Sequence, residues 1–478
     1  MYDWRQDCST DCMPLGHIAS MSIKRAKEQL RLAMQPRLIR EGGWILLGQV
    51  GSVAGNLVAL KALTQVLPPN IYGEVNLITV AMILPSWILF APFAQASIRM
   101  YSPSRERGLL PSMLSTCVMA HAVSSVLVSA VATSLILSGP LDFVGLPRLV
   151  GGLAVLVFLV EMWQGFGLGI YGAARRRAEV AILTSLAVWL RPFFALVMVW
   201  RFGASVPSVL GGYLVGGLLI LPLALRSIWR DIRISPGKGF QAGILKEMIV
   251  YGGPFAIWSI LAWSHSYVER YILEWIMGGG VVGPYVAAVQ VTGLPFLQAS
   301  GFLAAFIGPI AYERAGAASD TGRLESARTL IHQGLVLFAV AGVLIVSLYW
   351  VAGEWLMSIL THSSYVMPAG VLTILAVGGL AWSAAQLLAV QVFAYNRPIL
   401  LIWAHAVPAL LSLPLSWILV LMRGVEGAAI AKAATSLVHL AVLLGLTRGM
   451  LSADWKLVPV PHSSGDVSGP LFSSRERG

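Results

Sequence analysis

Ionisable side chains interrupt the long apolar segments of this chain at only a few positions. Glu161 and Arg191 stand on either side of the basic run Arg175–Arg177, each well inside an apolar segment. At a helical rise of about 1.5 Å per residue, each would lie about 16–18 Å along its helix from the segment end that is next to the basic run. The two side chains would therefore lie at a similar level. Such a pair either locks two helices together as a structural ion pair or does chemistry, with Arg191 binding a phosphate and Glu161 carrying a proton or balancing charge.

Further ionisable side chains occur in the segments that would begin and end the two halves of the chain. Lys61 and Arg270 stand 209 residues apart, each about one and a half helical turns from a segment end. They either reach back to the membrane surface or form a pair of cations that draws an anion, with Glu269 tuning Arg270. His265 precedes Glu269 by four residues, so the two can share a proton, although a buried histidine also serves in packing. Lys432, about two turns into the last segment, offers the same alternatives as Lys61.

Amide side chains at similar depths suit a cavity for a polar ligand. Gln49 and Asn56 are the amides that we assign to this candidate cavity, and they serve equally well in hydrogen bonds between helices. No GxxxxGKS/T phosphate loop, HExxH zinc motif or GxSxG nucleophile motif occurs in the sequence. The three cysteines, Cys8, Cys12 and Cys117, offer too few ligands for a metal site. We therefore expect a protein that is not an enzyme and has no cofactor or metal.

The elements that must position these residues are apolar segments long enough to cross a bilayer. The chain is 57% hydrophobic and 12% charged, which leaves few charges for a soluble surface. About 20 apolar residues in a helix span the hydrocarbon core. The sequence therefore predicts an all-α polytopic membrane protein of about twelve spans, at 42–66, 71–93, 111–138, 148–170, 180–201, 208–226, 248–276, 284–308, 331–353, 366–392, 399–421 and 425–447.

The distribution of basic residues predicts how these spans are oriented. Of the 33 Lys and Arg residues, three would lie in outer loops (Arg148, Arg201 and Arg423) and four within spans, and the remaining 26 fall on the other side. Because basic residues favour the cytoplasmic side, both termini are predicted to be cytoplasmic. The net charge of +11 is thus a topology signal with anionic lipid headgroups as secondary partners, and we expect no nucleic acid partner.

The spans group into two lobes with polar ends. We expect a cytoplasmic basic leader at 1–41, a six-helix lobe at 42–226, an inter-lobe loop at 227–247, a second six-helix lobe at 248–447 and a flexible tail at 448–478. The part of the leader from Ile23 to Arg40 forms either an amphipathic helix on the membrane surface or a disordered basic segment.

An internal repeat supports the two lobes. At an offset of 210 residues, the pair Gly42-Gly43 matches Gly252-Gly253, Gly73 matches Gly283, and Leu84-Pro85 matches Leu294-Pro295. Glycine and proline fix turns and kinks, so these matches indicate a similar chain path. Two halves of six spans each would be related by an axis along the membrane normal, with a cavity between them.

Four motifs, in order along the chain, resemble those of the polysaccharide transporters in the multidrug/oligosaccharidyl-lipid/polysaccharide (MOP) exporter superfamily. They are LPPNIYGEVNL from Leu67, QGFGLGIYGAARRRAEVA from Gln164 followed by Arg191-Pro192, ERYIL from Glu269 with VGPYVAA from Val282, and GVEGAAIA from Gly424. The resemblance covers about residues 42–447. The departures are the long basic leader and Pro284 inside the Gly-x-Tyr turn.

This resemblance implies a fold of two six-helix lobes and transport by alternating access. The implied substrate is undecaprenyl-diphosphate-linked oligosaccharide, moved from the inner to the outer leaflet of a bacterial inner membrane for O-antigen or exopolysaccharide synthesis. A polysaccharide polymerase or export machinery is a further candidate partner. The alternatives are a cation-coupled multidrug or metabolite antiporter of the same fold and, from another class, a membrane glycosyl- or acyltransferase.

Overall fold

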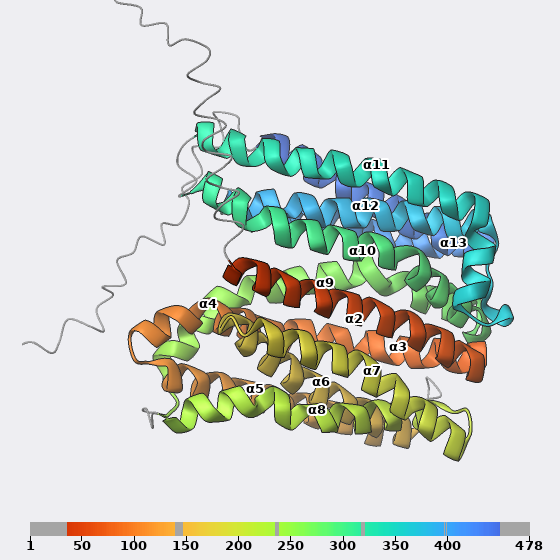
Figure 1. Cartoon of the computed structure of the whole chain (residues 1–478). Helices are drawn as coiled ribbons and strands as arrows, with labels where there is room; N and C mark the ends of the chain where they lie inside the picture. Colours follow the sequence, from red (N-terminus) through yellow and green to blue (C-terminus); the bar gives the residue numbers. More distant parts are fainter. Residues whose placement is uncertain are drawn as a thin grey trace, which may run out of the picture.

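The apolar segments form long helices in the computed structural model (Figure 1), which describes residues 36–138, 147–234, 239–316, 321–395, 397 and 399–449. This part of the chain contains eleven helices that are long and apolar enough to cross a membrane, α3, η1 and α4 forming one of them. The elements are α2 (Pro36–Val66), α3 (Pro69–Pro85), the π-helix η1 (Ser86–Phe90), α4 (Ala91–Glu106), α5 (Leu110–Leu137), α6 (Arg148–Ala173), α7 (Arg177–Phe202), α8 (Val206–Ile234), α9 (Ala242–Met277), α10 (Gly279–Ala315), α11 (Thr321–Leu360), the 3₁₀-helix η2 (Ser363–Tyr365), α12 (Ala369–Ala394) and α13 (Leu400–Gly449).

The last helix accounts for the difference between eleven helices and the twelve predicted spans. The backbone of Gly424, with φ +56° and ψ −128°, breaks the 50-residue α13. The rings of His405 and His439 lie 4.3 Å apart although 34 residues separate them. A straight helix would place them about 50 Å apart, so the two parts of α13 run antiparallel as two segments. The predicted helical membrane fold is confirmed.

Several helices continue beyond the predicted spans. The second span extends to Glu106, α8 extends to Ile234, and α9 begins at Ala242. Residues of the expected loop at 227–247 are therefore partly helical, because a helix can continue past the hydrocarbon core once its charged side chains reach water. The tail from residue 450 onward, Cys8, Cys12 and the leader up to residue 35 lie outside the described residues.

The helices form two groups, the first from α2 to α8 and the second from α9 to α13. The groups meet at α3, α4, α9 and α10. Helices α6, α7 and α8 pack on one another, and α2 packs on α7. In the second group, α12 packs on α10, α11 and α13, and α13 packs on α9. Figure 1 shows α5–α8 on one side and α10–α13 on the other. The first part of the second span, α3, packs on α10, and its last part, α4, packs on α9.

One end of the bundle is closed by the paired glycines of the internal repeat, and we call it the Gly73 end. A Cβ atom at Gly73 would lie 2.8 Å from the backbone nitrogen of Gly283, and one at Gly283 would meet the carbonyl of Pro69. Only glycine permits this approach of α3 to α10. Beside it, the ring of Tyr365 packs edge-on against Tyr72, and its hydroxyl donates to the carbonyl of Leu67 at 2.8 Å.

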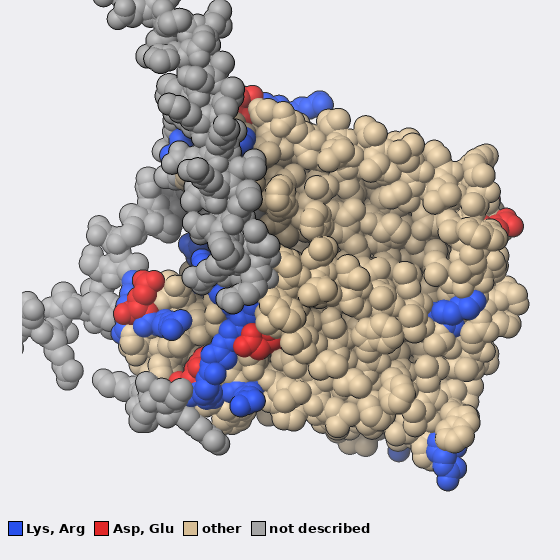
Figure 2. Space-filling model, in the orientation of Figure 1, with Lys and Arg blue, Asp and Glu red and all other residues tan. Residues whose placement is uncertain are grey.

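The opposite end carries most of the basic residues, and we call it the Arg-rich end. Figure 2 shows Lys and Arg gathered at this end on the face in view. Helices α2 and α13 begin and end here, at Pro36 and Gly449. The two groups also touch near this end, because Gly252 of α9 lies directly against Pro92 of α4.

Candidate functional site

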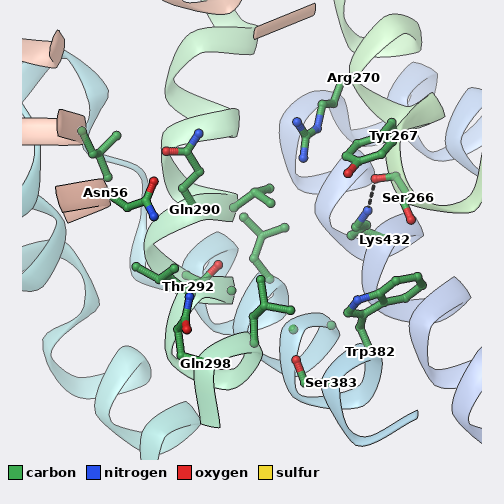
Figure 3. A pocket seen from close by; sticks show the side chains of 18 of the residues that line it. Asn56, Ser266, Tyr267, Arg270, Gln290, Thr292, Gln298, Trp382, Ser383 and Lys432 are labelled. Carbon is green, nitrogen blue, oxygen red and sulfur yellow. Dashed lines mark hydrogen bonds between the residues drawn. The ribbon is translucent and has the colours of Figure 1, made fainter. Parts of the chain in front are cut away.

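A cavity of about 500 Å³ lies between the two helix groups (Figure 3). Its walls come from α2, η1, α9, α10, α12 and the second segment of α13. The polar and aromatic residues of its lining are Asn56, Trp87, Ser266, Tyr267, Arg270, Gln290, Thr292, Gln298, Trp382, Ser383 and Lys432. This volume and mixed lining are typical of a ligand-binding site.

One wall of the cavity carries two cations that share a buried carboxylate. The side chain of Glu269 is 2% exposed, and its Oε1 lies 3.2 Å from Lys432 Nζ and 3.8 Å from Arg270 Nε. Two positive charges against one negative charge leave this wall with a net charge of +1. An anion is therefore the ligand that this wall favours.

Hydrogen bonds hold both cations in place. Arg270 donates to Oδ1 of Asn76 on α3 at 2.8 Å, and its guanidinium lies 5.0 Å from the ring centre of Tyr267. Lys432 donates to the backbone carbonyl of Ser266, as the dashed line in Figure 3 marks. Because α3 belongs to the first helix group and Arg270 to the second, this cation also bridges the groups.

Amide groups face the cations across the cavity. Figure 3 shows Asn56, Gln290 and Gln298 on the side opposite Arg270 and Lys432. The hydroxyl of Tyr72 donates to Gln290 Oε1 at 3.2 Å, and Asn56 Nδ2 donates to the carbonyl of its own helix at Ser52. Each amide retains further donors or acceptors, which suit hydroxyl-rich ligands such as sugars.

Two tryptophans that sequence reasoning did not assign to the cavity line it. Trp87 lies in the π-helix η1, and its carbonyl accepts a hydrogen bond from Ser259. Trp382 of α12 lies beside Lys432 in Figure 3. The preceding Pro85 was the available signal for Trp87, because proline inside a span marks a distorted helix. Two other tryptophans lie near Trp87 and Val80 without lining the cavity: Trp263 donates to the carbonyl of Val80, and Trp258 stacks on Trp87.

Of the predicted site residues, Arg270, Lys432 and Asn56 line the cavity, with Glu269 directly behind it. Gln49 is an exposed residue of α2 and is not part of the lining. Lys61 donates to the carbonyls of Ser358 and Thr361 at 3.2 and 2.8 Å, so it caps the end of α11.

Arg191 and Glu161 lie in the first helix group, away from this cavity. The expected ion pair between them is confirmed, at 2.6 Å. Arg191 also donates to Gln164 Oε1 at 2.5 Å, and Gln164 donates onward to the carbonyl of Gly217. This network joins α6, α7 and α8.

His265 does not pair with Glu269 as the four-residue spacing suggested. The ring nitrogens of His265 are buried and make no hydrogen bond to Glu269, and the ring lies against those of Trp382 and His439. The charge of Glu269 is instead met by Lys432 and Arg270. The i,i+4 spacing places two residues on one helix face, but the neighbouring α13 supplies a closer, charged partner.

Comparison with known proteins gives the family. The family model described as "Polysaccharide biosynthesis protein" matches residues 38–311, more than half of the chain. The chain belongs to this polysaccharide biosynthesis family. No curated protein matches the sequence.

Solved structures share the fold of this family member at low sequence identity. An inward-facing multidrug resistance MATE family transporter of the MOP superfamily aligns with a TM-score of 0.63 and 13% identity, over 86% of this chain and 96% of that one. The lipid II flippase MurJ, in an inward closed conformation, aligns with a TM-score of 0.64 and 13% identity, over 86% and 87%. A MOP superfamily transporter from Pyrococcus furiosus aligns with a TM-score of 0.61 and 12% identity, over 87% and 95%. This chain, a member of the polysaccharide biosynthesis family, therefore has the fold of the MOP transporters.

Proposed function

We propose that this protein moves polyprenyl-diphosphate-linked oligosaccharide from the inner to the outer leaflet of a bacterial inner membrane. The observation that carries the proposal is the pairing of Arg270 and Lys432 on one wall of the central cavity, with a net charge of +1. A diphosphate is a dense anion that needs donors and positive charge once it leaves water. The polysaccharide biosynthesis family and the lipid II flippase among the structural neighbours support a lipid-linked glycan as the substrate class.

The opposite wall supports a glycan beside the diphosphate. Asn56, Gln290 and Gln298 offer amide donors and acceptors to sugar hydroxyls, while Trp87 and Trp382 offer apolar ring faces. A cavity of about 500 Å³ lies within the range of small-ligand sites, so it holds the diphosphate and the first sugars rather than a whole oligosaccharide. A longer glycan therefore requires the cavity to widen during transport.

The charge distribution supports the membrane orientation on which the proposed direction of movement depends. Under the positive-inside rule, the Arg-rich end lies in the cytoplasm and the Gly73 end faces outward. In the described state the Gly73 end is closed by Gly73, Gly283 and the rings of Tyr72 and Tyr365. We infer that a substrate enters between the helix groups from the cytoplasmic leaflet, with its polyprenyl chain remaining in lipid, and leaves after the Gly73 contact opens.

Gene deletion tests the proposal in the host. We expect a complete polyprenyl-diphosphate-linked repeat unit to accumulate in the inner membrane while surface polysaccharide, such as O-antigen or exopolysaccharide, is lost. A matched strain that carries the intact gene on a plasmid should restore both. Normal intermediates with altered sensitivity to cationic dyes would contradict the proposal and favour a multidrug antiporter, and truncated glycans would favour a transferase.

A further inference from the structure

Three histidines of the second helix group lie against one another behind the wall of the cavity. His265 belongs to α9, and His405 and His439 belong to the two antiparallel segments of α13. Their ring centres are 4.3 Å apart for His405 and His439, 5.3 Å for His265 and His439, and 6.3 Å for His265 and His405. All three are 1–2% exposed, so the cluster lies entirely inside the protein. We call these three residues the histidine cluster.

Half of the ring nitrogens of the histidine cluster are unpaired. Nε2 of His405 and both ring nitrogens of His439 have no hydrogen-bond partner among the described residues, whereas the ring of His265 faces the backbone of Thr435. Nδ1 of His405 lies 3.1 Å from the indole nitrogen of Trp258 and 2.9 Å from the carbonyl of Leu401. Buried polar atoms without partners are uncommon in folded proteins and call for a functional explanation.

His121 shows that a buried histidine in this protein can be satisfied by ring packing and a carbonyl of its own helix. It is 1% exposed in α5, its Nδ1 lies 3.0 Å from the carbonyl of Cys117, and its ring stacks on Phe166 at 4.1 Å. No second histidine is in ring contact with it among the described residues. The histidine cluster therefore differs from an ordinary core histidine in the same chain.

Trp382 separates the histidine cluster from the cavity. Its indole lies 5.0 Å from the ring of His265 and 5.2 Å from that of His439, and the same side chain lines the cavity. Lys432, a cation of the cavity wall, lies close enough for its charge to act on His265. A charge on the cluster would thus be felt at the place where we expect the diphosphate to bind.

Few charged groups face the cluster. The α9 residues Tyr267, Glu269 and Arg270 contact one another, Lys432 or Asn76 rather than the rings, and on α13 Lys432 is the cation whose charge acts on His265. Helix α12 and η1 contain no ionisable side chain in their sequences. The helices α3 and α4, which also pack on α9, bring Glu74 and Arg99 toward opposite ends of that helix. With no carboxylate against the rings, a lasting positive charge in the closed cluster would be costly.

We propose that the histidine cluster takes up a proton during the transport cycle, when Trp382 moves away and water reaches the rings, and releases it when the cluster closes. Imidazole is the side chain that gains and loses a proton near neutral pH. No three His, Cys, Asp or Glu side chains in the described ranges are arranged to hold a metal ion. Because the proton binds one conformation better than the other, it shifts the balance between them. This inference rests on the proposed function in one respect, which is the identity of the substrate that the conformational change moves.

Spin-label distances test the proposal without any substrate. Labels on Ala204→Cys and Ser364→Cys, two exposed positions at the Gly73 end of the two helix groups, would be placed in a chain whose native cysteines are replaced. When the pH is lowered from about 8 to about 5.5, the population of molecules with the longer distance between the two labels should rise about threefold or more. The shift should be lost in the His265→Asn/His405→Asn/His439→Asn variant and retained in the matched His121→Asn variant. An unchanged wild-type distribution, or a shift that survives in the triple variant, would overturn the proposal.

Isotope-labelled histidine NMR gives a second test that needs only the wild-type fold. We expect the three cluster rings to titrate as one coupled group, so that replacing His439 alone changes the titration of His265 and His405 and leaves that of His121 unchanged. Cluster rings that stay neutral throughout the titration, or that titrate independently, would also overturn the proposal. Neither readout involves flipping, so a failure of the proposed function would be recognised separately.

Discussion

Glu269 and Lys432, which lie 163 residues apart in the sequence, hold a carboxylate and an ammonium group 3.2 Å apart at the wall of the central cavity. Glu269 is 2% exposed and Lys432 is 17% exposed. Arg270 is the second cation beside this carboxylate, at 3.8 Å. A buried charge without a partner is costly, so Glu269 fixes the positions of two cations that would otherwise repel each other.

The contribution of the ion pair between Glu269 and Lys432 can be measured as a change in the free energy of unfolding. Lys432→Met should lower the free energy of unfolding by about 3–5 kcal/mol, because it leaves the buried carboxylate with only the longer contact to Arg270. Adding Glu269→Gln to the same chain should recover most of that loss. Thermal unfolding in detergent checks both variants. A double variant as unstable as Lys432→Met would mean that the ion pair is not the source of the loss.

Anion binding should depend on Arg270 and not on Lys61. Arg270→Gln should weaken the binding of inorganic pyrophosphate about tenfold to a hundredfold, because it removes charged hydrogen-bond donors and brings the net charge of the wall to zero. Lys61→Gln is the matched control, because Lys61 caps α11 with its charge outside the cavity. Quenching of tryptophan fluorescence can report the binding, since Trp87 and Trp382 line the cavity. Equal losses in both variants would indicate a general effect of net charge.

The helical fold could be predicted from the sequence to a large extent. Each of the twelve apolar segments corresponds to helix, and Gly424 and Gly73 mark a chain reversal and a close contact that glycine permits. Pro85 signals a distorted helix, but the π-helical form of η1 and the direction in which its side chains point could not be predicted. Trp87, which lies in η1, lines the cavity.

The cavity could be predicted only in part, because hydropathy gives the depth of a residue and not the direction in which it points. Arg270 and Lys432 line the cavity, whereas Lys61, at the same expected depth as Arg270, binds carbonyls at the end of α11. Arg191, which was expected to lie deeper, pairs with a glutamate inside the first helix group. The rotation of each helix about its own axis depends on packing with neighbours far away in the sequence. The meeting of His405 with His439 depends in the same way on the reversal at Gly424.

The contact at the Gly73 end should hold the described state closed. Gly283→Ala places a methyl group against the carbonyl of Pro69 and should open this end, whereas Gly280→Ala, on the same helix, meets nothing within 4 Å. A cysteine at Val289, which lines the cavity, should then react faster with a membrane-impermeant thiol reagent applied from the Gly73 side in the Gly283→Ala chain only. Equal reaction rates in the two chains would show that the glycine contact does not control access.

The ion pair of the first helix group should be structural. Arg191→Met should lower the free energy of unfolding by about 1–3 kcal/mol, a moderate loss because the side chains of Arg191 and Glu161 are 24% and 28% exposed. The double variant with Glu161→Gln should lose less than the sum of the two single variants, as expected for residues in contact. Additive losses in a double-mutant cycle would contradict the coupling between them.

Flipping by the purified protein tests the central claim most directly. The wild type and Arg270→Gln would be placed in liposomes that contain polyprenyl-diphosphate-linked oligosaccharide, and the glycan that reaches the opposite leaflet would be measured with an enzyme added outside. We predict transfer by the wild type and a loss of about tenfold or more in Arg270→Gln, at equal amounts of folded protein. Wild-type vesicles that transfer no more glycan than empty ones, or an Arg270→Gln variant as fast as the wild type, would contradict the account.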